Sequence, residues 1–223
     1  MESKPPVPGE DVARGARVLA DRHKLMRSFL DAYGVPRLYR GSFDPGRVRM
    51  NLDQDPFGFL VETVVYQQLS GTSARAIFAR LVEETGLDPE RILAAGLDRL
   101  RQLGLSSSKC QTVINLASSV LCARLDLARI AGEPDAVVRA AVVSQRGFGP
   151  WSADMFLMFH LRRLDVWPAG DLAMRRSVER HWAGGEKLKG YRLDEIGEEY
   201  RPYRSLAAWY FWADDHARLL ASS

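Results

Sequence analysis

The sequence predicts an all-α protein built of two lobes. Asp55-Pro56 and Asp88-Pro89 each place an N-capping acid before a proline at the first helical position. Gly86, Gly96 and Gly104 stand where helices are expected to end. Apolar residues recur every three to four positions over most of the chain, and no strand-like alternation competes with them. A chain of 223 residues is long enough for two packed lobes.

Several segments carry apolar residues at helical spacing and are expected to be helices. They run from about 11 to 33, from about 56 to 69, around Ile77 to Val82, from Ser108 to about 124, and over the aromatic-rich stretch after Pro202. Prolines and glycines interrupt any period from Gly34 to Gln54, which predicts an extended connection between lobes, with a hairpin as the alternative. We assign 56–170 to a central lobe. The tail and helix within 1–55 are expected to pack with the C-terminal helices of 171–223, which complete the second lobe.

The composition is that of a globular protein without an evident metal centre. Hydrophobic residues make up 46% of the chain and charged residues 26%, which is too hydrophobic for general disorder. The net charge of +3 favours polyanionic partners only mildly. The two cysteines and four histidines show none of the spacings of zinc or iron-sulfur ligands. No segment reaches the roughly 18 apolar residues of a membrane helix, and the N-terminus has no apolar signal region, so we expect a cytoplasmic protein that does not enter a membrane.

The most informative segment, Val143–Ala153, contains a Gly-x-Gly turn followed by a proline that can begin a new helix. This order predicts a helix-hairpin-helix over about 136–161. Glycines let the turn approach a ligand closely, and the N–H groups at the start of the second helix can hold a phosphate without reading base sequence. Taken alone, Gly147-Phe148-Gly149 is also typical of a plain helix-helix turn.

A second string, Asp165–Arg175, begins eighteen residues after Gly147. Together, the hairpin and this string resemble the helix-hairpin-helix DNA glycosylase superfamily. In that superfamily the hairpin is followed by a loop that ends in an essential aspartate at the start of the next helix, and Asp171 falls at that place. The resemblance implies a two-lobed fold with the DNA-binding cleft between the lobes.

Three further motifs narrow the resemblance to bacterial 3-methyladenine DNA glycosylase II, a branch that acts on alkylated bases. They are Tyr66–Ser70, Leu103–Ser106 with Lys109, and Arg201–Tyr210. The matches cover roughly residues 56 to 213. Larger members of this branch carry an N-terminal β-rich domain, for which the 55 residues before Pro56 are too few, so the chain resembles a compact form.

Asp171 is our candidate for the catalytic group. Cleavage of an N-glycosidic bond builds positive charge on the sugar, and a neighbouring carboxylate stabilises that charge or orients the attacking water. Considered without its surroundings, an aspartate at this place is more typical of a helix N-cap. Asp165 is the nearest rival carboxylate, and we expect it to cap or brace the loop.

Departures from other branches of the superfamily indicate a monofunctional enzyme. Bifunctional members place a lysine just after the hairpin, and its amine forms a Schiff base that leads to strand cleavage. Here that position is Trp151. The resemblance therefore implies water as the nucleophile and no AP-lyase activity. The four-cysteine cluster of other members is also missing, because both cysteines precede the hairpin, and we expect no required cofactor.

The resemblance also implies an aromatic base pocket. An alkylated purine often carries positive charge, which electron-rich rings attract by roughly 0.5 to 2 kcal/mol per contact. The residues implied for the pocket are Trp151, Met155, Trp209 and Tyr66. For Met155 and for Trp212, a plain core position is an open alternative.

A flipped base leaves a gap in the duplex, and Gln68 or Leu69 is the candidate to fill it. The residues implied to bind DNA lie in this turn and in the hairpin: Gln67, Gln68, Leu69, Arg146, Gly147, Phe148, Gly149 and Ser152. A solvated helix end is the alternative for the glutamines. In relatives the hairpin carbonyls hold a monovalent cation, which here would be Na⁺ or K⁺ at the carbonyls of Arg146 and Phe148.

We therefore expect a monofunctional DNA glycosylase of base excision repair. It would flip alkylated bases such as 3-methyladenine from double-stranded DNA and hydrolyse the N-glycosidic bond to leave an abasic site. We expect it to work as a monomer, in the cytoplasm at the nucleoid. The alternatives are a non-catalytic helix-hairpin-helix lesion sensor, and a glycosylase for oxidised or mismatched bases. Binding without release of free base from alkylated DNA would favour the lesion sensor. Release of an oxidised base but no methylated base would favour the glycosylase for oxidised or mismatched bases.

Overall fold

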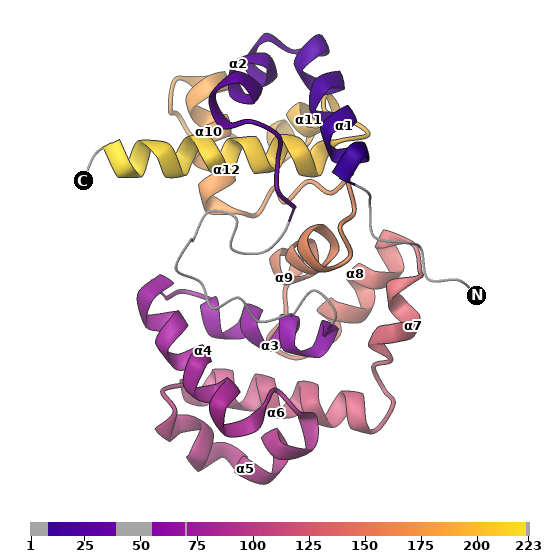
Figure 1. The fold of residues 1–223 in the computed structure, drawn as a ribbon, viewed down its shortest axis with the longest axis vertical. Helices are drawn as coiled ribbons and strands as arrows, with labels where there is room; N and C mark the ends of the chain where they lie inside the picture. The colour runs from indigo at the N-terminus through magenta and orange to yellow at the C-terminus, as the bar shows by residue number, and fades with distance from the viewer. Residues whose placement is uncertain (1–8, 39–54, 70, 222–223) are drawn as a thin grey trace. The chain divides into compact units, whose positions relative to one another are not determined.

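The computed structural model describes residues 9–38, 55–69 and 71–221. Over these residues the chain forms twelve α-helices and one π-helical turn, and no β-strand occurs among them (Figure 1). The all-helical prediction is confirmed. The described residues group into two compact units, of which 55–160 form the first and 9–38 with 161–221 form the second. Within the described chain, no helix combines the length and the apolar character needed to cross a membrane.

The described part of the first unit consists of seven α-helices and the π-helical turn. They are α3 (Pro56–Tyr66), α4 (Gly71–Thr85), α5 (Pro89–Gln102), α6 (Ser107–Leu121), α7 (Leu127–Ala131), α8 (Asp135–Val143), α9 (Pro150–Met155) and η1 (Phe156–His160). The caps form as the sequence predicts. The Asp55 carboxylate accepts from the Phe57 N–H at 3.0 Å, and the Asp88 carboxylate from the Arg91 N–H at 2.9 Å. Because α3 packs on α4 and α6, and α5 on α6, side chains such as Leu100 are fully buried.

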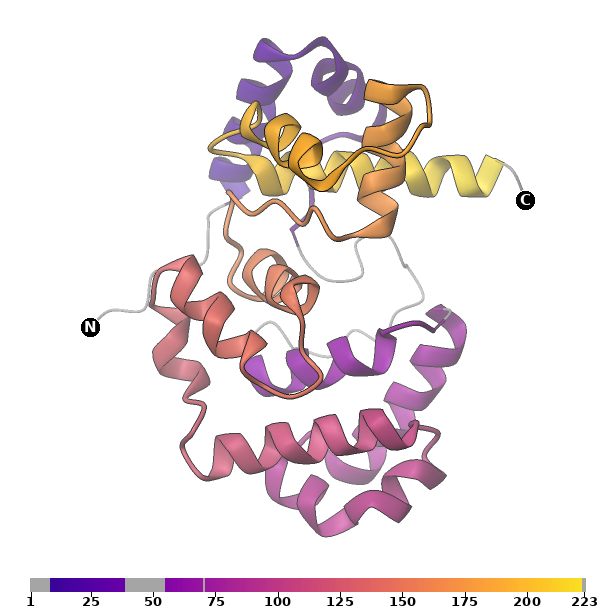
Figure 2. The ribbon, with the colours of Figure 1, turned by 180° about the vertical axis from the view of Figure 1, so that it is seen from behind.

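The second unit is built from two separate stretches of the chain. Its helices are α1 (Gly9–Arg22), α2 (Lys24–Tyr33), α10 (Leu172–Ala183), α11 (Gly190–Glu198) and α12 (Arg204–Ala221). The long helix α12 packs against α1, α2 and α10, and Figure 2 shows it from behind, coloured yellow. The rings of Phe29 and Tyr200 each lie 5.8 Å from that of Phe211, centroid to centroid. These rings form an aromatic core between α12 and the elements that pack on it.

Two predicted helices have different bounds in the structure. We predicted one helix over 11–33, but the chain breaks at His23, whose extended backbone (φ −132°, ψ 120°) separates α1 from α2. The helix predicted to reach about residue 69 ends at Tyr66. It ends there because Gln67 leaves helical geometry and Gln68 takes a left-handed conformation with φ 56°.

Two connecting segments complete the chain path. Residues 161–170 cluster with the second unit, whereas we assigned them to the central lobe. Ser205 of α12 anchors this segment: its hydroxyl donates to the Arg163 carbonyl at 2.6 Å and accepts from the Val166 N–H at 3.0 Å. The predicted connection from Gly34 to Gln54 lies mostly outside the described residues.

Candidate active site and nucleic-acid interface

The predicted hairpin joins α8 to α9 in the first unit. Gly147 takes φ 89°, a left-handed conformation that favours glycine. Space is also limited there, because a Cβ added to Gly147 would lie 2.2 Å from Oγ1 of Thr112. Gly149 is extended and α9 begins directly after it, at Pro150. The helix-hairpin-helix prediction is confirmed, and a larger residue than glycine does not fit at 147.

The hairpin residues predicted to bind DNA fall into two groups by exposure. Arg146 and Gly147 are exposed and Gly149 is half-buried. Phe148 and Ser152 are buried, with exposed fractions of 6% and 1%. The two buried residues therefore support the turn from within, and contact of any of the five with DNA stays a prediction.

The second predicted DNA-binding turn lies beside the hairpin. The side chain of Gln67 places its Nε2 3.4 Å from the Gly147 carbonyl and 3.4 Å from the Ser152 hydroxyl. Gln68 is exposed, and Leu69 has an exposed fraction of 40%, high for an apolar side chain. The structure thus brings the two predicted DNA-binding turns together. Both candidates to fill the gap left by a flipped base, Gln68 and Leu69, lie at the surface.

Three of the predicted pocket residues belong to the first unit. Tyr66 is the last residue of α3 and is half-buried. Trp151 and Met155 lie four residues apart on α9, a spacing that puts two side chains on one helix face. Trp151 is half-buried, whereas Met155 has an exposed fraction of only 6%. Their role in a base pocket stays a prediction.

Asp171 is the N-cap of α10 in the second unit. Its Oδ1 accepts bonds from the backbone N–H groups of Ala173 at 3.0 Å and Met174 at 2.9 Å. The indole Nε1 of Trp212 donates to the same oxygen at 2.7 Å. The three N–H donors fix the position of Oδ1, and the positive end of the helix dipole favours the negative charge of the carboxylate. Capping and catalysis are therefore compatible roles for Asp171.

The sequence left the part played by Trp212 undecided. Trp212 is half-buried on α12 and is the tryptophan that bonds Asp171. Trp209, which we predicted for the pocket, has an exposed fraction of 5%, and its ring packs edge-on to Tyr210 with centroids 5.6 Å apart. Both tryptophans lie on α12, and they differ in exposure and in that Trp212 bonds Asp171. A place for Trp209 in the pocket stays a prediction.

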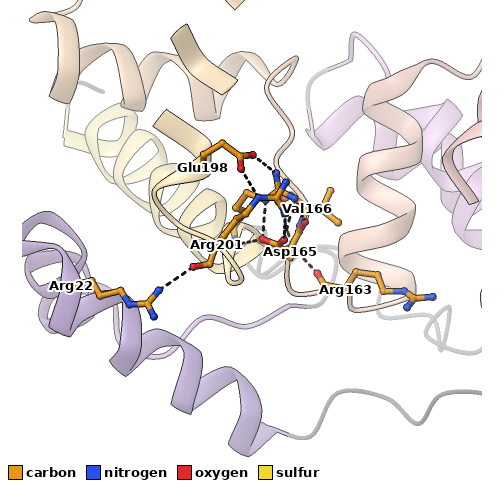
Figure 3. A network of polar contacts seen from close by, with 8 residues as sticks. Arg22, Arg163, Asp165, Val166, Glu198 and Arg201 are labelled. Carbon is orange, nitrogen blue, oxygen red and sulfur yellow. Dashed lines mark hydrogen bonds and ion pairs between the residues drawn. The ribbon is translucent and has the colours of Figure 1, made fainter. Parts of the chain in front are cut away.

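A network of charged side chains holds the loop that precedes Asp171 (Figure 3). The Asp165 carboxylate accepts from Arg201 at 2.7 Å and from Nε of Arg204 at 2.8 Å. Glu198 accepts from the same two arginines, at 2.5 and 3.1 Å. With its carboxylate bound by two guanidinium groups, Asp165 braces the loop, as the sequence analysis expected. Asp171 is therefore the better candidate for chemistry.

Two buried carboxylates on α12 clamp α10. Asp215 accepts from Arg176 at 3.2 and 2.5 Å and from Arg180 at 2.9 Å, and Asp214 accepts from Arg180 at 2.9 Å. Burial alone would raise the pKa of both carboxyl groups. Hydrogen bonds from neighbouring side chains, these arginines among them, outweigh burial and hold each pKa below the usual 3.8. Because α10 starts at Asp171, this clamp fixes the helix that carries the candidate carboxylate.

The described residues offer no cluster for a multidentate metal site. Among them, no group of three or more His, Cys, Asp or Glu side chains could hold a metal ion. Cys110 and Cys122 are both free thiols. The monovalent cation predicted at the carbonyls of Arg146 and Phe148 would use backbone oxygens instead, and it stays a prediction.

The glycine turn between α8 and α9 makes the chain a helix-hairpin-helix protein. A family model, the HhH-GPD superfamily of base excision DNA repair proteins, matches residues 61–200. The chain belongs to this superfamily.

Named relatives and a solved structure agree with this membership. The chain is 30% identical over 181 residues to DNA-3-methyladenine glycosylase 1 of Schizosaccharomyces pombe, a match that covers 77% of each chain. A Bacillus subtilis relative, also named for DNA-3-methyladenine glycosylase, is 25% identical over 170 residues, which are 72% of this chain and 59% of that protein. The chain thus spans less than two thirds of the length of this relative. The crystal structure of a DNA-3-methyladenine glycosidase from Bacillus halodurans matches with a TM-score of 0.73 at 27% identity, covering 96% of this chain and 91% of that one.

Proposed function

We propose that the protein is a DNA glycosylase that removes alkylated bases from double-stranded DNA and leaves an abasic site. The observation that carries this proposal is Asp171, whose Oδ1 is held by three N–H donors at the start of the helix that follows the hairpin. Membership of a base excision repair superfamily supports the reaction class. The names of the relatives support 3-methyladenine as the first substrate to test.

Asp171 would act on the sugar of the flipped nucleotide. When the N-glycosidic bond breaks, its electron pair leaves with the base, and positive charge develops on the sugar. A carboxylate that is already fixed beside the sugar stabilises this charge without reorganising. Water then adds to the sugar carbon and loses a proton, which gives free base and an abasic site. A purine alkylated at N3 or N7 is cationic before cleavage, so it leaves as a neutral base without a separate acid.

We infer that the nucleophile is water and that the strand stays intact. Trp151 is the second residue after Gly149, at the position where bifunctional members carry their lysine. Among the described residues of the first unit the single lysine is Lys109, and its Nζ bonds the carbonyls of Val65 and Gln67. Neither residue supports Schiff-base chemistry.

The two turns of the first unit are the proposed DNA interface. The N-terminal end of α9 supplies N–H groups for a phosphate, and the exposed Arg146 adds positive charge. Exposed Gln68 or Leu69 would fill the gap left by the flipped base. Binding should weaken steeply with salt, because each phosphate contact releases counterions. Whether the protein is a monomer on DNA is measured directly by light scattering of the complex.

The test is chromatography of the bases released from methylated duplex DNA by the wild-type protein and by Asp171→Asn. We expect free methylpurine with the wild type alone, and strands that break only after alkali on a gel. A wild-type protein that binds methylated DNA but releases no base would be a lesion sensor. Release of oxidised base without methylated base would show that the substrates are oxidised bases and not alkylated ones.

A further inference from the structure

Helix α6 contacts both turns that are proposed to meet DNA. Near its start, Nζ of Lys109 donates to the carbonyl of Val65 at 2.8 Å and to that of Gln67 at 2.7 Å. Thr112 follows three residues later and lies directly against Gly147, where even a Cβ would come within 2.2 Å of its Oγ1. Residues three apart on a helix are neighbours on its surface. One stretch of α6 therefore supports the turn after α3 and the hairpin turn together.

The ammonium group of Lys109 meets the carbonyls at the end of α3. The last carbonyls of a helix have no partner within it and carry partial negative charge, so a cation placed there is a strong cap. Lys109 is half-buried, and burial lowers the pKa of its ammonium group. Its bond to Gln67 falls on the residue at which the chain leaves the helix, with φ −57° and ψ 126°. Lys109 thus fixes the direction in which the turn departs.

The next residue shows that the turn is held and not free. Gln68 has φ 56°, which is uncommon outside glycine and persists where surrounding contacts enforce it. Its neighbours supply such contacts, because Gln67 bonds Lys109 through its carbonyl and approaches Gly147 and Ser152 through its side chain. The exposed end of the turn is therefore presented on a rigid support.

We propose that Lys109 is a positioning residue for base flipping. Through Val65 and Gln67 it holds the Gln67–Leu69 turn at a fixed place beside the hairpin, so that the turn enters the duplex while the hairpin holds the backbone. This inference rests on the proposed glycosylase function. Lys109 acts through the turn, so its loss slows flipping and leaves bond cleavage intact.

The test compares one methylated purine in two settings, paired in a duplex or unpaired in a single-base bulge of the same sequence. An unpaired base costs less to extrude, so it depends less on the turn. Lys109→Met should slow single-turnover excision of the paired lesion by about tenfold or more, the scale of lost hydrogen bonds from a charged group, and leave the bulged lesion near wild type. Lys109→Arg keeps the charge and the donors and should restore most of the rate. Lys24→Met, at an exposed residue of α2, removes the same charge and is the matched control.

A second measurement reads flipping without chemistry. The fluorescence of 2-aminopurine beside an abasic site rises when the neighbouring bases unstack, and Lys109→Met should reduce that rise. Circular dichroism verifies folding, and if Lys109→Met unfolds, Lys109→Gln takes its place. Equal loss on the paired and bulged lesions, or no loss on the paired one, would overturn the inference. A wild type that excises neither lesion would refute the proposed function instead, and the fluorescence result would still decide the role of Lys109.

Discussion

The two units hold their functional groups by different means. In the first, the turns are fixed through the backbone, by Lys109 on two carbonyls and by Thr112 against Gly147. In the second, two arginines of α10 and two buried carboxylates of α12 fix the helix of Asp171. A turn held against the backbone is sensitive to the size and shape of its residues, whereas a clamped helix is sensitive to protonation. The units should therefore fail under different perturbations.

The largest expected effect is on chemistry in the second unit. Asp171→Asn keeps the shape and capping ability of the side chain but removes its negative charge. We expect single-turnover excision of a methylated base to fall by about 10²- to 10³-fold. Affinity for abasic DNA, measured by fluorescence anisotropy, should change little because the proposed DNA-binding turns are in the first unit. Near-normal excision by this variant would remove Asp171 from the mechanism.

At the hairpin turn of the first unit, shape is expected to matter more than charge. Gly147→Ala should lower the free energy of unfolding by about 1–3 kcal/mol, because the residue has φ 89° and its Cβ would meet Thr112. Gly149→Ala is the matched control, since a Cβ there meets nothing within 4 Å and φ is −112°. Urea unfolding of both variants gives the comparison. Equal destabilisation of the two would show that the fit against Thr112 does not hold the turn.

A smaller effect is expected where an aromatic ring meets the carboxylate. Trp212→Phe keeps a ring on α12 but removes the N–H that donates to Asp171 at 2.7 Å. Excision should slow by about tenfold, with unchanged DNA affinity. The control is Trp182→Phe, whose ring packs on Tyr200 and Phe211 in the same unit. If Trp212→Phe and Trp182→Phe lose the same activity, the bond from Trp212 to Asp171 does not contribute to excision.

The smallest effect concerns acid stability of the clamp. The pKa of Asp215 is lowered in the folded protein, because the arginine bonds outweigh burial. Its contribution to stability is therefore present above the ordinary value of 3.8 and is lost as the pH falls through the lower folded pKa. The free energy of unfolding should decrease between about pH 5 and pH 3, and less steeply for Asp215→Asn. Asp98→Asn, an exposed change in the first unit, controls for the lost charge. Equal slopes for wild type and Asp215→Asn would contradict this account.

Signals that are local in sequence were sufficient to predict the turn before Pro150 and the helix start at Asp171. The glycines at 147 and 149 and the proline at 150 specify the turn and the helix that follows it within four residues. The signal for a helix start at Asp171 is equally local. The catalytic role predicted for Asp171 came from the family resemblance. Similar capping patterns predicted the starts of α3 and α5 correctly.

Contacts between residues far apart in sequence were beyond the reach of these patterns. Lys109 bonds Val65 across 44 positions, and Trp212 bonds Asp171 across 41. Periodicity places each side chain on a helix face but does not say what the face meets. The same limit explains why we assigned residues 161–170 to the central lobe. Their place in the second unit depends on partners about forty positions downstream. The sequence therefore predicted the elements that carry the candidate groups better than it predicted the contacts that support them.

The path of the chain also sets an order of maturation during synthesis. Roughly 170 residues separate Tyr33 from Arg204, so at about 5–20 residues per second α12 follows α2 by roughly 9–34 s. The first unit is complete in the meantime, once His160 has left the ribosome. The helices made first keep apolar faces such as that of Phe29 open to water until the last helix arrives. A nascent or prematurely ended chain therefore carries the proposed DNA-binding turns before Asp171 has acquired its partner on α12.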